Sequence, residues 1–229
     1  TCQCQAPCQC PKKPKGGTAI AIPHTAIELK KDESLTQAIS RIKASAKTRG
    51  DGRMITVETL INGEPVRIAS IYAPVNDGRA TFFSEIKNSI NSSTIIGIDA
   101  NCVLNPAIDL DRPGVTAAYD NSGATELIDL LTHHQLVDTL RETMGDGHKF
   151  FTNHTVTERD VRVTRTRIDQ IHVPVIDAMQ WTSLPDEADF MRRGRRYGHD
   201  TVQSELNIIR EPRGKDLKFI NEKIYEDDH

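Results

Sequence analysis

The sequence predicts an α+β fold, and three observations support that prediction. Residues 54–72 alternate in polarity around a tight-turn signal, residues 95–98 form a short apolar run, and helical stripes precede and follow that run. The resulting order is hairpin, helix, strand, helix and then further strands. This order does not alternate as regularly as in a βαβ protein, so it favours a sandwich of packed sheets and helices.

The elements of the first half follow from local patterns. Residues 16–23 read as a glycine turn that leads into a short buried strand, whereas residues 24–48 are weakly patterned, with apolar side chains at helical spacing at Ile39, Ile42 and Ala46. Residues 54–61 alternate like a strand, Asn62-Gly63 is a strong hairpin signal, and residues 66–72 return as the second strand. Pro74 ends that strand.

The elements of the second half are also predicted from local patterns, and its helices are longer. Residues 80–91 and 124–134 each place their apolar side chains on one stripe, which predicts two helices packed on the core. Residues 109–114 read as a loop. Residues 136–138 start a short segment, and further strands are predicted over 149–152, 162–175 and from 202 to about 209.

Composition describes an ordinary soluble protein, with 37% hydrophobic and 27% charged residues. No apolar run has the length of a membrane span and no signal peptide is visible, so we expect no membrane partner. The net charge of −3 argues against coating nucleic acid by bulk electrostatics, but it allows a local basic groove.

The first 15 residues form a segment rich in Cys, Gln and Pro that we expect to be irregular. It contains Cys2, Cys4, Cys8 and Cys10, whose C-x-C-x3-C-x-C spacing differs from the C-x2-C pairs of a zinc ribbon. A soft-metal site, a disulfide knot and a tail without structure remain open, and composition favours the tail. Cys102, which stands alone, is expected to be a small buried side chain.

Polar side chains gather at the ends of predicted strands: Tyr72, Asp99, Asn101, Asp169 and His199. Asp99 and Asn101 are two apart, so on an extended backbone they share a side and could hold a water, a phosphate oxygen or a hard cation. An Asp that hydrogen-bonds a His forms a general acid/base pair. The structural alternatives are a strand-ending turn for Asp99 and Asn101, a core aromatic for Tyr72, an ion pair for Asp169 and a loop histidine for His199.

These residues lie in motifs that resemble a known group of proteins. In chain order the motifs are 17–22 (GTAIAI), 68–74 (IASIYAP), 96–101 (IGIDAN), 109–112 (DLDR), 136–138 (LVD) with Arg141, 151–152 (FT), 167–171 (RIDQI) and 198–202 (GHDTV). The set resembles the endonuclease/exonuclease/phosphatase superfamily. More narrowly, it resembles the apurinic-type endonuclease domain of non-LTR (LINE-type) retrotransposons.

The resemblance implies a four-layer, DNase I-like α/β sandwich over residues 16–210 that hydrolyses DNA phosphodiester bonds with Mg²⁺ or Mn²⁺. Asp99 would activate water and is the tentative metal ligand, Asn101 would hold the phosphate, and Tyr72 would touch the phosphate or the leaving group. Asp169 and His199 would form the dyad at the scissile phosphate. Residues 211–229 resemble the linker toward a reverse transcriptase, and we expect a nuclear location.

Two departures from the family pattern favour an alternative function. Residues 1–15 resemble neither of the family's first strands, so the domain is expected to be incomplete at its N-terminus and to lack the family's glutamate metal ligand. Gly198 stands where the family has a carboxylate. The alternative is therefore a catalytically impaired pseudo-nuclease that binds nucleic acid or protein. A phosphatase acting on a lipid or a small molecule is a weaker third reading.

Arginines that could contact a DNA backbone form two clusters: Arg159, Arg162, Arg165 and Arg167, and then Arg192, Arg193, Arg195 and Arg196. The second cluster, together with Arg167, is predicted to bind nucleic acid because it lies close to the candidate site in sequence. Solvated charge on an edge strand is the alternative for the first cluster.

Overall fold

The computed structural model describes residues 18–75, 77–145, 147–156, 163–185, 197–199, 202–206 and 217–220. Its helices are η1 (His24–Ala26), α1 (Leu35–Ser45), α2 (Arg79–Ile86), η2 (Lys87–Ser89), α3 (Pro106–Asp109), α4 (Ala124–His133), α5 (Thr139–Met144) and η3 (Val175–Gln180). None of the helices in these ranges combines the length and the hydrophobicity that a membrane crossing requires.

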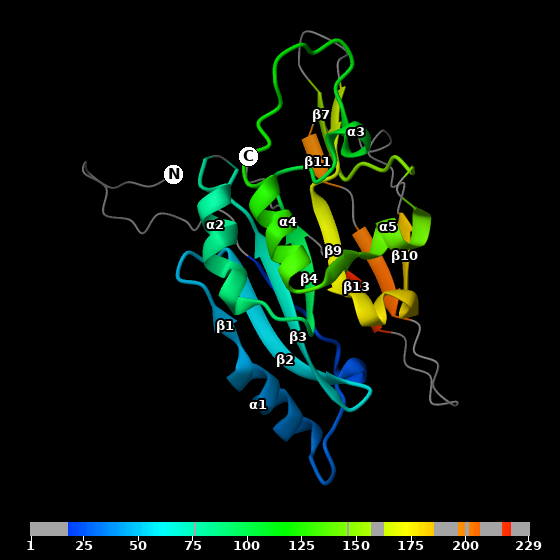
Figure 1. Ribbon diagram of the computed structural model, residues 1–229. Coiled ribbons are helices and arrows are strands. Elements are labelled where there is room, and N and C mark those ends of the chain that lie inside the picture. The colour runs from blue at the N-terminus through cyan, green and yellow to red at the C-terminus, as the bar shows by residue number, and fades with distance from the viewer. Residues whose placement is uncertain are drawn as a thin grey trace, which may run out of the picture.

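The strands form one large sheet and two small ones. The six-stranded sheet has the order β1-β2-β3-β4-β9-β6 and contains β1 (Lys47–Thr48), β2 (Met54–Ile61), β3 (Glu64–Tyr72), β4 (Thr94–Asp99), β9 (Asp169–Pro174) and β6 (Leu136–Asp138). Within it β3 and β4 are parallel, and the other pairs are antiparallel. The predicted α+β class is confirmed by this mixed sheet and its covering helices (Figure 1).

The smaller sheets are antiparallel throughout. One has the order β10-β12-β13, from β10 (Trp181–Pro185), β12 (Val202–Leu206) and β13 (Leu217–Ile220). The other has the order β11-β7-β8-β5, from β11 (Tyr197–His199), β7 (Asn153–Val156), β8 (Val163–Thr166) and β5 (Leu110–Asp111). β13 lies in the segment that the sequence analysis assigned to a linker, and it pairs with β12.

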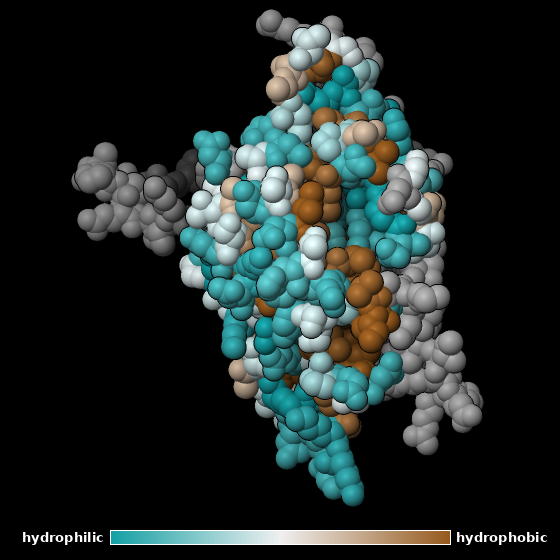
Figure 2. Space-filling view, in the orientation of Figure 1, coloured by the Kyte–Doolittle hydropathy of each residue, from teal (hydrophilic) through white to brown (hydrophobic). Residues whose placement is uncertain are grey.

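The two faces of the large sheet bury different cores. Ala69, Ile71, Ile96 and Ile98 point to the face that α2 and α4 cover, where they meet phenylalanines of α2 and leucines of α4. Because alternate residues of a strand face opposite sides, Ile68 points to the other face, where α1 packs. Figure 2 shows a mostly hydrophilic surface over α2 and α4, as expected when their apolar stripes face the sheet.

Several segments differ from the sequence predictions in position or kind: residues 149–152 form no strand, since β7 begins at Asn153, and the loop predicted over 109–114 contains β5. Residues 18–23 form no strand, and Ile20 and Ile22 instead pack against the α1 core as irregular chain. Residues 35–45 form α1, which follows the helical spacing and begins with a capping box at Ser34 and Gln37. The strand predicted over 162–175 is two strands, because the chain passes at Arg167 and Ile168 from the four-stranded sheet, which contains β8, to the six-stranded sheet, which contains β9.

Arg167 lies in the core, with its side chain only 2% exposed. Its Nε donates to Oδ1 of Asp109 at 2.8 Å, and its Nη1 donates to Oδ2 of Asp138. Burial alone would raise the pKa of Asp138, but the charge of Arg167 holds that pKa below its usual range. A guanidinium in this position is closed to a DNA backbone, so its position supports a structural role in place of the nucleic-acid contact predicted from the sequence.

Replacing Arg167 should be much more destabilising than replacing its exposed neighbour Arg165. Arg167→Met leaves the buried carboxylates short of a partner, and we expect a loss of about 3–5 kcal/mol in the free energy of unfolding. Arg165, whose side chain is 45% exposed and pairs with Asp111, is the matched control, and Arg165→Met should cost less than about 1 kcal/mol. Urea denaturation of both variants tests the difference, and equal losses would contradict the assignment.

His172 should make the stability of the protein fall in mild acid. Burial lowers the pKa of His172 to about 4, whereas a histidine in the unfolded chain titrates near 6.5. Between about pH 4 and pH 6.5 the unfolded chain therefore binds one proton more at His172 than the folded protein does. The stability from neutral, buried His172 is complete above about pH 6.5 and is lost progressively down to about pH 4, by roughly 3 kcal/mol in total.

Denaturation midpoints measured from pH 7 to pH 4 test this effect. His172→Gln should remove that part of the slope, while the exposed control His133→Gln should keep it. An unchanged slope in His172→Gln would refute the assignment.

Candidate active site

Three of the predicted site residues lie side by side in one row of the large sheet. Tyr72 pairs with Asp99 in the β3–β4 register, and Asp99 pairs with Asp169 in the β4–β9 register. Residues that pair across strands project to the same face, so the three side chains emerge together at one end of the sheet. Two of the strands that carry them, β4 and β9, are buried along almost their whole length, which makes this edge a rigid base for a site.

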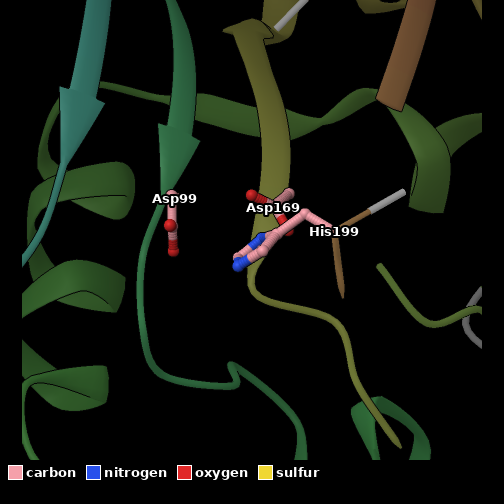
Figure 3. A group of neighbouring side chains, drawn as sticks. All are labelled: Asp99, Asp169 and His199. Carbon is pink, nitrogen blue, oxygen red and sulfur yellow. The ribbon is translucent and has the colours of Figure 1, made fainter. Parts of the chain in front are cut away.

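His199 joins this row from a different sheet. It lies on β11, which pairs with β7, and its Nδ1 is 2.8 Å from Oδ2 of Asp169. Figure 3 shows the two carboxyl groups at the ends of neighbouring strands, with the imidazole directed toward them. The structure therefore brings together the Asp–His pair that the sequence analysis named, from positions 30 residues apart.

Asn101 reaches the site by a turn, not by strand alternation as predicted. β4 ends at Asp99, and Asn101 has a positive φ of 49°, a conformation that Asn tolerates better than most residues. Its backbone N–H donates to Oδ1 of Asp99 at 3.2 Å, and its Nδ2 donates to the carbonyl of Ala73 at 2.8 Å. This Asx turn places the amide between the ends of β3 and β4.

Arg79 holds the loops around Asn101, a role that no sequence motif indicated. Its side chain is 3% exposed and donates to the carbonyls of Val75, Asn101 and Ser122 at 2.9, 2.8 and 2.7 Å, and to the carboxylate of Asp120 at 2.6 Å. Gly123, at a φ of +88°, allows this approach, because a Cβ there would lie 2.6 Å from the Cβ of Arg79.

Two further side chains support the row and were also missed by the sequence analysis. The Oγ1 of Thr152 accepts hydrogen bonds from the backbone N–H groups of Ile168 and Asp169, at 3.1 and 3.0 Å, which fixes the start of β9. The guanidinium of Arg53 lies 5.1 Å from the ring centre of Tyr72, a cation–π contact at the edge of the site. Thr152 belongs to the 151–152 motif, so a sequence motif pointed to Thr152, whereas none pointed to Arg53.

A pocket of about 290 Å³ opens beside the row. Asn101, Asn153 and Ile168 line it on the side of the site, and Tyr119, Asp120 and Thr166 contribute to its other walls. The mixture of amides, hydroxyls and one carboxylate makes the pocket suited to a polar ligand. A molecule bound at Asp99 and His199 therefore has room to extend into a polar recess.

The donor atoms of the row fit a divalent cation. One ligand atom from each of Asp99, Asp169 and His199 lies within 4.8 Å of the others. Burial raises the pKa of Asp169, the charge of Asp99 raises it further, and the hydrogen bond from His199 opposes both effects. Two adjacent buried carboxylates favour a bound positive charge, and carboxylate oxygens are the ligands that Mg²⁺ and Mn²⁺ prefer.

The remaining predicted residues divide into two groups. Arg167 lies in the core, as described above. Arg192, Arg193, Arg195 and Arg196 lie outside the described residues, as do Arg159, Arg162 and the N-terminal cysteines Cys2, Cys4, Cys8 and Cys10. Cys102 is buried as expected, and its burial raises the pKa of the thiol to about 12.

No family model and no curated protein sequence matches the chain. Solved structures do match it. The endonuclease domain of TRAS1, a telomere-specific non-LTR retrotransposon, is 12% identical, with 57% of this chain and 54% of that chain covered and a TM-score of 0.42. The 3′-5′ exonuclease NExo from Neisseria meningitidis is 20% identical, with 68% and 65% covered and a TM-score of 0.49.

A third match is truncated TDP2 from Caenorhabditis elegans, at 14% identity, with 60% of this chain and 52% of that chain covered and a TM-score of 0.36. The chain spans between half and two thirds of the length of these three structures. All three belong to the endonuclease/exonuclease/phosphatase group, which is the group that the sequence motifs resemble. Likeness at this level concerns folds, so the activity of this chain has to be argued from its own site residues.

Proposed function

We propose that this protein is a divalent-metal-dependent endonuclease that hydrolyses phosphodiester bonds in DNA. One observation carries the proposal: Tyr72, Asp99 and Asp169 stand in one row of the sheet, and His199 is hydrogen-bonded to Asp169 at 2.8 Å. This arrangement supplies a general base, an Asp–His pair and a hydroxyl donor within one buried edge. The family resemblance of the surrounding motifs supports DNA as the substrate.

In the proposed hydrolysis each site residue has a separate role. Asp99 orients the attacking water and takes its proton as the water oxygen bonds to phosphorus. Asp169 holds the His199 imidazole, which faces the phosphate, and the Asn101 amide and the Tyr72 hydroxyl donate to phosphate oxygens. The bond from phosphorus to the 3′ oxygen breaks, solvent water protonates the departing oxygen, and Asp99 returns its proton to solvent, which leaves a 5′ phosphate and a 3′ hydroxyl.

The cation would be held by the carboxylates of Asp99 and Asp169. Both ring nitrogens of His199 are engaged, Nδ1 with Asp169 and Nε2 with Asn153, which leaves the carboxylate oxygens as the donors that fit. When bound, Mg²⁺ or Mn²⁺ neutralises negative charge on the phosphate and on the departing oxygen.

The order of the motifs also supports an origin in a non-LTR retrotransposon, with a reverse transcriptase as the neighbouring domain and the nucleus as the location. A nuclease of that kind produces the 3′ hydroxyl from which reverse transcription starts.

A pseudo-nuclease that binds nucleic acid or protein is the second candidate. Gly198, which pairs with His154 in the β11–β7 register, stands where the family has a carboxylate beside its histidine. Loss of that carboxylate would weaken the binding of a metal or the phosphate, while the fold is kept.

Nicking of supercoiled plasmid with Mg²⁺ or Mn²⁺ tests the proposed reaction. We expect metal-dependent nicking by the wild type and a loss of about 10²–10⁴-fold in His199→Ala, because that variant lacks the imidazole of the Asp–His pair. Asp99→Asn should lose activity to a similar extent. His133→Ala, on the exposed end of α4, is the control and should nick normally. A folded wild type that binds DNA without nicking it would favour the pseudo-nuclease.

Cation binding can be tested without any activity. Titration calorimetry with Mn²⁺ should detect a site in the wild type, and Asp99→Asn should weaken it by about 100-fold, because a direct carboxylate ligand is lost. Asp129→Asn, which removes an exposed carboxylate of α4, is the matched control and should bind like the wild type. Equal Mn²⁺ affinities in the wild type and in Asp99→Asn would show that the cation does not bind at Asp99 and would contradict the proposed site.

A further inference from the structure

His199 has a second side-chain partner, Asn153, which is not among the predicted site residues. The two residues are directly opposite each other in the β7–β11 register, so the backbone ladder itself brings their side chains together on one face. The Nδ2 of Asn153 lies 2.8 Å from the Nε2 of His199. Asn is uncommon in strands, where β-branched and aromatic residues pack better, so its presence at this register position calls for a reason.

The two hydrogen bonds of His199 define one tautomer of the neutral ring. An ionised carboxylate only accepts hydrogen bonds, so Nδ1 must carry the proton that it donates to Asp169. Nε2 is then the nitrogen with the lone pair, and it accepts from the amide N–H of Asn153. The imidazole is therefore held at both nitrogens, and its plane is fixed by two partners on different strands, β9 and β7.

Asn153 also faces the pocket beside the site. It is half-buried and lines this pocket together with Asn101 and Ile168. The Nε2 end of the ring is consequently hydrogen-bonded to a residue of the pocket wall. The same amide can turn by 180° and present its Oδ1, so it can also accept from a protonated Nε2 during a reaction cycle.

We propose that Asn153 is a positioning residue that fixes the ring plane and the tautomer of His199 by donating a hydrogen bond to its Nε2 at the edge of the pocket. This inference deepens the proposed function, on which its kinetic test rests, whereas its spectroscopic test does not depend on it. A purely structural role for the amide is less suited to the geometry, because the backbone pairing of β7 with β11 does not need this side chain.

The spectroscopic test uses the full chain labelled with ¹⁵N-histidine. The chain has eight histidines, and His199→Ala identifies the signals of His199 by their disappearance. In the wild type the ¹⁵N signals should show the tautomer protonated at Nδ1, and the hydrogen bond from Asn153 should change the ¹⁵N chemical shift of Nε2. Asn153→Leu, of similar size without a donor, should remove that Nε2 shift.

Asn153→Gln keeps the amide and should restore part of the Nε2 shift. Thr164→Val changes the same pocket on the neighbouring strand β8 and serves as the control, with the imidazole signals unchanged. Identical Nε2 signals in the wild type and Asn153→Leu would overturn the proposal.

The kinetic test uses plasmid nicking and a double-mutant cycle. Asn153→Leu should lower kcat about 100-fold with little change in KM, because it misplaces a catalytic group without removing a substrate contact. In a His199→Ala background the same substitution should cost almost nothing further, since the residue it positions is already absent. A full additional loss in that background would show that Asn153 acts independently of His199 and would overturn the proposal.

The two tests separate the failure of this inference from that of the proposed function. A wild type that does not nick DNA, with an Nε2 shift that depends on Asn153, would refute the nuclease and keep the positioning role. Nicking that depends on His199 but is unaffected by Asn153→Leu would keep the nuclease and refute the positioning role.

Discussion

The guanidinium of Arg167 lies in the core between the carboxylates of Asp109 and Asp138, and the geometry of the site depends on this buried charge. The pairs join α3 and β6 to the start of β9, and the backbone N–H of the same residue donates to Asp109. Asp169 lies two residues after Arg167, so fixing Arg167 also fixes the backbone that carries Asp169. A buried ion pair contributes little net stability over apolar packing, but it is costly to break, which makes it suitable for specifying one arrangement.

The site is built from three separate constraints that meet at one edge. Strand register aligns Tyr72, Asp99 and Asp169, a turn with positive φ brings Asn101 alongside, and a second sheet delivers His199. Arg79 and Thr152 hold the loops and the strand start behind them. The neighbouring carboxylates of Asp99 and Asp169 thus lie at the ends of two buried strands, β4 and β9, and the packed core holds these strands in place.

The proposed chemistry and the positioning role of Asn153 share one physical basis. A histidine beside two carboxylates has several possible tautomers and ring orientations, and only some of them suit proton transfer at a phosphate. Partners on both nitrogens reduce these to one in the structure described here. Asn153 also lines the polar pocket, so the residue proposed to position the ring belongs to the surface that a bound ligand would meet.

By itself the sequence determined the α+β class, the Asn62-Gly63 hairpin, the two sheet-covering helices and the candidates Tyr72, Asp99, Asp169 and His199, because each depends on local periodicity, turn chemistry or a short motif. Only the tertiary structure decided that Arg167 is buried, that Asn101 arrives by a turn, that Arg79 contacts Asn101 and that Asn153 contacts His199. The 151–152 motif ended one residue before Asn153, whose partner lies 46 residues away. Contacts between distant strands depend on register and packing, which leave no local pattern in the sequence.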